Sequence, residues 1–143
     1  MNKRFSALLA VLVVSAPVGV CAADAELPVP IQKYESVRYY SAGVGAEERR
    51  QVPQLYPLRV IFKTDKGNLL SDADVTITAK GATIFRGRAQ NGPWLVVDLA
   101  PGTYDIAAVQ DGKTQTAKGV KLAAGKIRTV TMKWKTADVD MGL

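Results

Sequence analysis

The chain contains no histidine and a single cysteine, Cys21, among its 143 residues. A serine or cysteine nucleophile activated by histidine is therefore excluded, because no imidazole is present to accept the proton. The usual zinc and copper ligand sets, which depend on histidine and cysteine, are missing as well. These absences predict a protein that is not an enzyme, with no catalytic residue, no metal site and no cofactor.

Long hydrophobic runs are also scarce, and the one that exists lies near the amino terminus. Lys3 and Arg4 precede an apolar run from Phe5 to Val20, and small residues follow before Asp24. This three-part layout is typical of a secretory signal peptide. The run is shorter than the ~20 residues that a membrane-spanning helix needs. We expect residues 1–23 to be removed and the mature chain to be periplasmic, without a transmembrane segment.

The only cysteine lies inside that expected signal peptide. Cleavage after Ala23 would leave a mature chain without cysteine, so that its fold would depend on its hydrophobic core and not on a disulfide. The alternative is lipidation of Cys21, as in bacterial lipoproteins. Val20, directly before it, is bulkier than the small residue that such signals carry at this place. The exact cleavage site stays open.

Three segments outside the main hydrophobic pattern define the expected domain organisation. Residues 24–45 contain Pro28 and Pro30 and no clear period, which predicts a flexible lead. Residues 46–56 begin with helix formers and place acids first, which predicts a short helix that caps one end of the domain, with a docking site as the alternative role. Residues 136–143 lack a pattern and are expected to form a disordered tail.

Residues 58–135 show the alternation of β-strands. A period of two runs through residues 58–63, where Leu58, Val60 and Phe62 share one face, and through residues 128–135, where Val130, Met132 and Trp134 do. Turn signals such as Pro101-Gly102 and Asp111-Gly112 separate about seven short strands. The pattern predicts an all-β protein, a single seven-stranded Greek-key β-sandwich.

The segment Leu99-Ala100-Pro101-Gly102-Thr103-Tyr104-Asp105-Ile106 resembles the Leu-x-Pro-Gly-x-Tyr-x-hydrophobic signature of carboxypeptidase regulatory-like domains. Residues 72–78 look like the early strand of that family. Residues 43–49 and 91–95 look like a subgroup of small secreted proteins of Gram-negative bacteria. The resemblance covers about residues 41 to 135. It implies a transthyretin-like (prealbumin/Ig-like) sandwich and an accessory or binding module, and it supplies no functional residue.

The positive charge is concentrated near the carboxyl end of a chain whose net charge is +6. Seven basic residues and no acidic residue lie between positions 113 and 135: Lys113, Lys118, Lys121, Lys126, Arg128, Lys133 and Lys135. Two adjacent strands would present a positive face, with Lys118, Lys121, Lys133 and Lys135 contacting an anionic envelope component such as lipopolysaccharide, phospholipid or an acidic protein. Nucleic acid is not expected as a partner in this compartment. The alternative is that the lysines protect a terminal strand from aggregation.

Three aromatic residues, Tyr39, Tyr40 and Trp94, are candidates for sugar binding. Exposed aromatic rings on a β-sandwich can stack on sugars, as in carbohydrate-binding modules. The alternative is that Trp94 packs in the core and that Tyr39 and Tyr40 anchor the lead to the domain.

The aspartate carboxylates are the remaining candidates for metal binding or acid–base catalysis. Asp72 and Asp74 would share one strand face, where they could bind calcium weakly or act as an acid–base pair. The alternative is a solvated turn. Asp98 and Asp105 flank the Pro-Gly turn and are expected to hydrogen-bond its backbone.

The leading hypothesis is a monomeric, non-catalytic periplasmic module that binds an envelope protein or an anionic envelope component. The first alternative is a carbohydrate-binding module that takes a glycan. The remote alternative is hydrolysis, as in the transthyretin-related hydrolases, whose activity depends on histidine.

Overall fold

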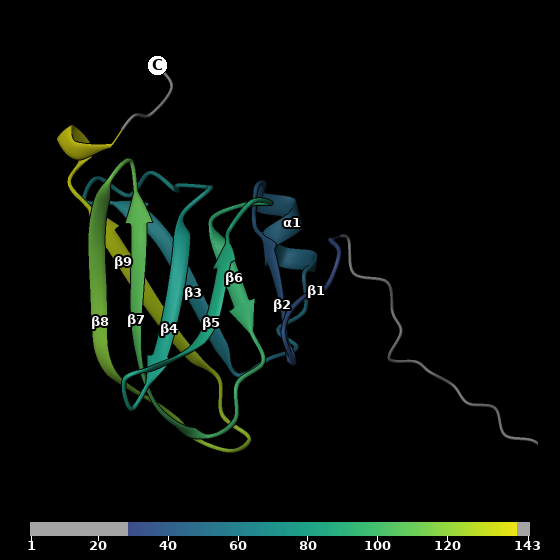
Figure 1. Cartoon of the computed structure of the whole chain (residues 1–143). Helices are drawn as coiled ribbons and strands as arrows, with labels where there is room; N and C mark the ends of the chain where they lie inside the picture. The colour runs from purple at the N-terminus through teal and green to yellow at the C-terminus, as the bar shows by residue number, and fades with distance from the viewer. Residues whose placement is uncertain (1–28, 140–143) are drawn as a thin grey trace, which may run out of the picture.

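The computed structural model describes residues 29–139, so the expectations for residues 1–23 and Cys21 lie outside the described residues. Nine strands form two sheets in this part of the chain (Figure 1). The all-β prediction is confirmed, and the expected number of seven strands is too low. The strands are β1 (Gln32–Tyr34), β2 (Val37–Ala42), β3 (Leu58–Thr64), β4 (Asp74–Ala79), β5 (Ala82–Arg88), β6 (Trp94–Val97), β7 (Gly102–Gln110), β8 (Lys113–Leu122) and β9 (Arg128–Trp134).

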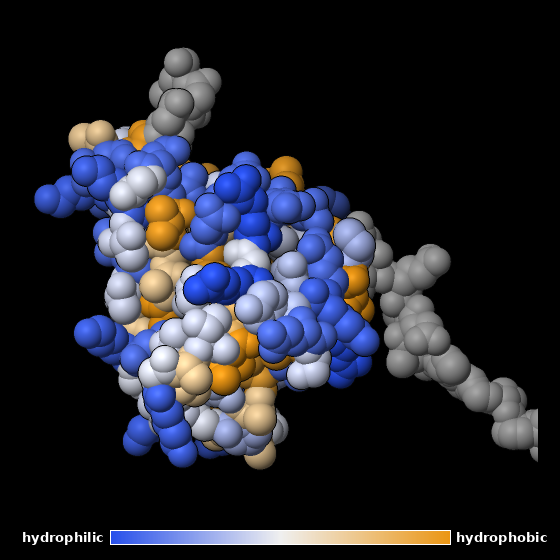
Figure 2. Space-filling model, viewed as in Figure 1, coloured by the Kyte–Doolittle hydropathy of each residue, from blue (hydrophilic) through white to orange (hydrophobic). Residues whose placement is uncertain are grey.

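The two sheets have five and four strands. The five-stranded sheet has the order β1-β2-β6-β3-β9, and the four-stranded sheet has the order β5-β4-β7-β8. All pairs are antiparallel except β3 and β9, which run parallel. Figure 1 shows the four-stranded sheet in front of β3 and β9. The face that this sheet turns toward the viewer mixes hydrophilic and near-neutral residues with a few hydrophobic patches (Figure 2).

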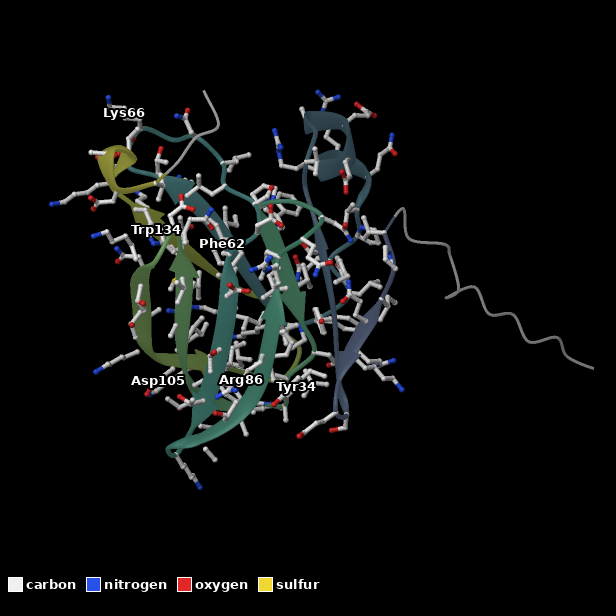
Figure 3. All side chains as sticks on the ribbon, turned by 45° about the horizontal axis from the view of Figure 1, so that its top comes forward. Tyr34, Phe62, Lys66, Arg86, Asp105 and Trp134 are labelled. Carbon is white, nitrogen blue, oxygen red and sulfur yellow. The ribbon has the colours of Figure 1, made fainter. Side chains whose placement is uncertain are left out.

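The main core lies between the sheets and follows from the period-two pattern. Side chains alternate between the two faces of a strand, so every second residue points inward. On β3 and β9 the buried residues alternate with more exposed ones. The rings of Phe62 and Trp134 lie 6.2 Å apart in this interior (Figure 3). Residues of the facing sheet, including Ile77 and Ile106, complete the same cluster.

The expected flexible lead is ordered from Gln32 to Ala42, where β1 and β2 form. Tyr39 is buried, and its ring meets that of Phe85 edge-on at 4.8 Å. The alternation in this short segment is too brief to predict a strand after two prolines. Residues 39–42 form a strand by pairing with β6. The interpretation of this part of residues 24–45 as flexible is therefore wrong.

The expected disordered tail is likewise ordered as far as it is described. Residues Thr136–Asp138 form a 3₁₀ turn, η2, and Val139 is buried in the main core. The Asp65 carboxylate accepts hydrogen bonds from the Thr136 hydroxyl at 2.6 Å and from its amide at 3.0 Å. Asp65 is 71 residues away in the chain, so local sequence could not indicate this anchor.

The helix is shorter than the expected 46–56. Helix α1 spans Ala46–Gln51 and buries none of its own residues. The segment after it buries Val52 and Tyr56 in a second, smaller cluster. In that cluster they meet Tyr40 of β2 and Val96 of β6 on the outer face of the five-stranded sheet. The cover over β2 and β6 therefore comes from the residues after the helix.

Candidate functional site

Among residues 29–139, no comparable segment covers the outer face of β3 and β9. Arg59 and Lys63 are half-buried, whereas Thr129 and Lys133 are exposed. The inward positions of both strands are filled by the core, so the alternate positions must face outward. We call this surface the basic outer face, and its residues are Arg59, Ile61, Lys63, Thr129, Thr131 and Lys133. It contains no carboxylate.

Two lysines of the basic outer face lie directly opposite each other. Lys63 of β3 and Lys133 of β9 are register partners in the parallel ladder. Neighbouring strands are about 4.8 Å apart, and like charges in opposite positions destabilise a sheet. Three ion pairs in the described residues join Arg38 to Asp98, Arg50 to Glu47 and Arg88 to Asp74. None of them offsets the charge of the two lysines.

Arg59 extends the positive charge toward β6. Its guanidinium carbon lies 4.7 Å from the ring centre of Trp94, which is cation–π geometry. One of its terminal nitrogens donates to the Thr129 hydroxyl at 3.3 Å. Its Nε is buried and has no hydrogen-bond partner in the described residues. The guanidinium is thus held in place while part of its donor capacity stays unused.

The three aromatic residues proposed for sugar stacking do not present an exposed ring face on which a sugar could stack. Tyr39 is 8% exposed and Tyr40 is fully buried. The Tyr40 hydroxyl donates to the Pro53 carbonyl and accepts from the Leu55 amide at 3.3 Å. Burial raises the pKa of the Tyr40 hydroxyl above its ordinary value. Trp94 is half-buried, with Arg59 stacked over its ring.

The four lysines predicted from the sequence do not meet in one place. Lys118 and Lys121 lie on β8, an edge of the four-stranded sheet, whereas Lys133 lies on β9, an edge of the other sheet. The Trp134 indole donates to the Lys113 carbonyl at 2.9 Å, so the end of β9 lies beside the start of β8. Lys121 is therefore near the opposite end of the sandwich. Lys135 follows β9 and is exposed.

The structure brings Lys133 to Lys63 and Arg59, which the sequence analysis did not propose as binding residues. The sequence signal for this surface was limited to the polar positions that Arg59, Lys63 and Lys133 occupy on strands with a period of two. The pairing of β3 with β9 was needed to place them on one surface.

Three of the four carboxylates singled out from the sequence, those of Asp74, Asp98 and Asp105, are engaged in structural contacts. Both oxygens of Asp74 accept from Arg88, at 2.9 and 3.1 Å, and this hydrogen bonding lowers the pKa of Asp74. Asp98 pairs with Arg38 at 2.9 Å. Asp105 accepts from the Gly119 amide at 2.9 Å. Neither Asp98 nor Asp105 bonds the Pro-Gly turn as expected, since other partners lie closer.

A hydrogen bond from an aromatic residue stabilises the Pro-Gly turn instead. The Tyr104 hydroxyl donates to the Ala100 carbonyl at 2.7 Å.

Among residues 29–139, no group of three or more histidine, cysteine or acidic side chains has an arrangement that could hold a metal ion. No helix in the same range is both long and apolar enough to cross a bilayer.

An apolar cleft of about 330 Å³ opens at the end of the sandwich where β3 begins. Its walls come from the segment before β3, the β6–β7 connection and the β8–β9 connection. It lies at the opposite end of β3 from Lys63 and is therefore a separate feature from the lysine pair.

Comparison with known proteins adds no assignment. No protein-family model matches the chain, and no curated protein sequence matches it. The resemblance to carboxypeptidase regulatory-like domains stays a prediction from the sequence.

Proposed function

We propose that the protein is a non-catalytic binding module of the periplasm that contacts anionic envelope lipids through its basic outer face. In this proposal the chain acts as a monomer and its sandwich has the Greek-key, prealbumin-like topology of carboxypeptidase regulatory-like domains. The absence of histidine supports a binding role over hydrolysis, because the related hydrolases depend on that residue.

The observation that carries the proposal is the unmatched lysine pair. Lys63 and Lys133 face each other without a carboxylate among the outward residues of their strands. Such an arrangement lowers stability unless an anion lies over it. A lipid phosphate provides that charge, and each lysine near an anionic surface contributes about 1 kcal/mol to binding. Arg59 adds a third cation on the same face.

Lipid phosphates fit the surface better than sugars do. A sugar ring needs an exposed aromatic face, but Tyr39 and Tyr40 are buried and Arg59 lies over Trp94. The exposed hydroxyls of Thr129 and Thr131 are hydrogen-bond donors that suit phosphate oxygens.

The test is co-sedimentation of the purified protein with vesicles. We expect binding to vesicles of phosphatidylcholine mixed with phosphatidylglycerol, and none to phosphatidylcholine alone. The double variant Lys63→Gln/Lys133→Gln should bind about 30-fold more weakly, which corresponds to about 2 kcal/mol for two lysines. Added salt should weaken binding of the unchanged protein, because salt screens exposed charges.

The matched control is Lys118→Gln/Lys121→Gln, which removes the same charge from β8. We expect its vesicle binding to stay within a few-fold of the unchanged protein. Equal losses in both double variants would indicate attraction by net charge alone. That result, or no binding to anionic vesicles at all, would overturn the proposed role of this face.

A further inference from the structure

The apolar cleft at the start of β3 has the size and lining of a small-ligand site. Its volume of about 330 Å³ falls within the usual range of ligand pockets, about 300–1,000 Å³. Leu99 and Leu122, which are both buried, form part of its lining and also belong to the main core. The cleft therefore extends from the surface to the hydrophobic interior.

The cleft is bordered by two of the most exposed apolar side chains in the described residues. Leu55 is 49% exposed and Ile127 is 57% exposed, and they lie on different wall segments. Exposed apolar side chains that gather at a hollow are typical of an interaction site, whereas scattered ones are ordinary. A ligand between Leu55 and Ile127 would remove both from water.

Hydrogen bonds hold the walls in fixed positions. The Arg128 amide donates to the Pro57 carbonyl at 2.7 Å, which joins the start of β9 to the segment before β3. Buried Tyr40 bonds the backbone at Leu55. Gly125 has φ of 74°, a conformation that side chains disfavour, so the turn between β8 and β9 depends on glycine. A cleft built in this way is largely formed before a ligand arrives.

The charge of the lining has one sign. Lys126 is the single charged residue among the described residues that line the cleft, and it is exposed at the turn. Gln54 is the one amide side chain among the described lining residues, and its amide nitrogen donates to the Tyr56 carbonyl at 2.6 Å. An apolar hollow with one ammonium group at its border matches a molecule that is apolar along its length and anionic at one end.

We infer that this cleft binds the hydrocarbon chain of a fatty acid, with the carboxylate beside Lys126. This site is distinct from the basic outer face, so it adds a small-molecule ligand to the proposed lipid-surface contact. The cleft has a finite volume, so only a limited length of chain can be buried. Each methylene buried strengthens binding about fourfold, and methylenes beyond the filled cleft add nothing.

The test is isothermal titration calorimetry of the purified protein with saturated fatty acids of increasing length. Each fatty acid is kept below its critical micelle concentration. We expect one saturable site, affinity that rises about fourfold per methylene, and a plateau once the cleft is full. Affinity that increases with length without a plateau would mean unspecific partition and would overturn the inference, as would the absence of saturable binding.

Two variants locate the ligand. Ala124 is exposed and lines the cleft, so Ala124→Phe places a ring in the hollow. We expect it to weaken binding at least tenfold, whereas Ala82→Phe, at the exposed start of β5, leaves binding unchanged. Leu55→Ser weakens binding without adding bulk, and Leu69→Ser is its exposed apolar control. Equal effects in each pair would place the ligand elsewhere and overturn the inference.

The carboxylate is tested by comparison of a fatty acid with the primary alcohol of the same length. Lys126→Gln should weaken binding of the acid about two- to fivefold, as expected for an exposed charge pair, and leave the alcohol unchanged. Lys63→Gln/Lys133→Gln should leave both unchanged, which separates this site from the vesicle-binding face. If Lys126→Gln affects acid and alcohol equally, the assigned orientation is wrong.

Discussion

Lys63 of β3 and Lys133 of β9 occupy the same register position on the outer face of a parallel strand pair. Residues 70 positions apart in the chain thus become register partners on neighbouring strands. Local sequence preference cannot produce such a pair, and its repulsion works against the pairing of the two strands.

Lys133→Glu should stabilise the protein while it weakens anionic-vesicle binding. The substitution replaces repulsion of Lys63 by attraction, which is worth about 0.5 kcal/mol on a sheet surface. Urea unfolding measures the gain. Lys121→Glu is the control, because its register partner is Thr103 and no lysine lies opposite. Stabilisation of equal size in both variants would mean that overall charge, and not the pair, sets the effect.

Gly92→Ala should lower the free energy of unfolding more than Gly67→Ala does. Both glycines have positive φ, 140° and 90°, so both substitutions introduce backbone strain of about 1 kcal/mol or more. A methyl group at Gly92 would also lie 2.4 Å from the Ala42 carbonyl oxygen, whereas the space around Gly67 is open. Chemical denaturation of the two variants compares them. Equal losses would contradict the close approach at Gly92.

Tyr40→Phe should destabilise the protein by about 1–3 kcal/mol, because it leaves the Pro53 carbonyl without its donor and the Leu55 amide without its acceptor. It should also weaken fatty-acid binding, since Leu55 forms part of the cleft wall. Tyr34→Phe is the control, because the Tyr34 side chain contacts Phe85 through its ring and the substitution keeps that ring. Thermal unfolding and the calorimetric titration provide the two measurements, and an unchanged stability would refute the role of the hydroxyl.

The η2 segment should detach at acid pH. Hydrogen bonds from Thr136 hold the pKa of Asp65 below its ordinary value of about 3.9. A lowered folded pKa stabilises the contact above the ordinary value, and this stabilisation is lost as pH falls through the folded pKa. The amide resonance of Thr136, followed by NMR as pH is lowered, measures the release.

The control for this titration is Asp65→Asn, which keeps an oxygen acceptor but cannot ionise. We expect the Thr136 resonance to lose its acid transition in that variant. The same transition in both proteins would show that another group controls the segment.

Several features were predictable because they depend on neighbours in the chain. The alternation from Leu58 to Lys63 predicted which side chains enter the core, and the structure confirms it. The Asp111-Gly112 turn predicted the hairpin of β7 and β8. The pattern around Tyr39 and Tyr40 is short and follows two prolines, so the same reasoning missed β2 and gave the anchoring of both rings only as an alternative.

The sequence by itself determined the strand periodicity, the positive charge and the lack of histidine chemistry, since each is a property of residue types and their local order. Only the tertiary structure decided that Lys133 meets Lys63, that Asp65 anchors Thr136, and that three distant segments enclose the apolar cleft. These relationships depend on which strands become neighbours, and that choice is made by burial of the whole core and not by any single segment.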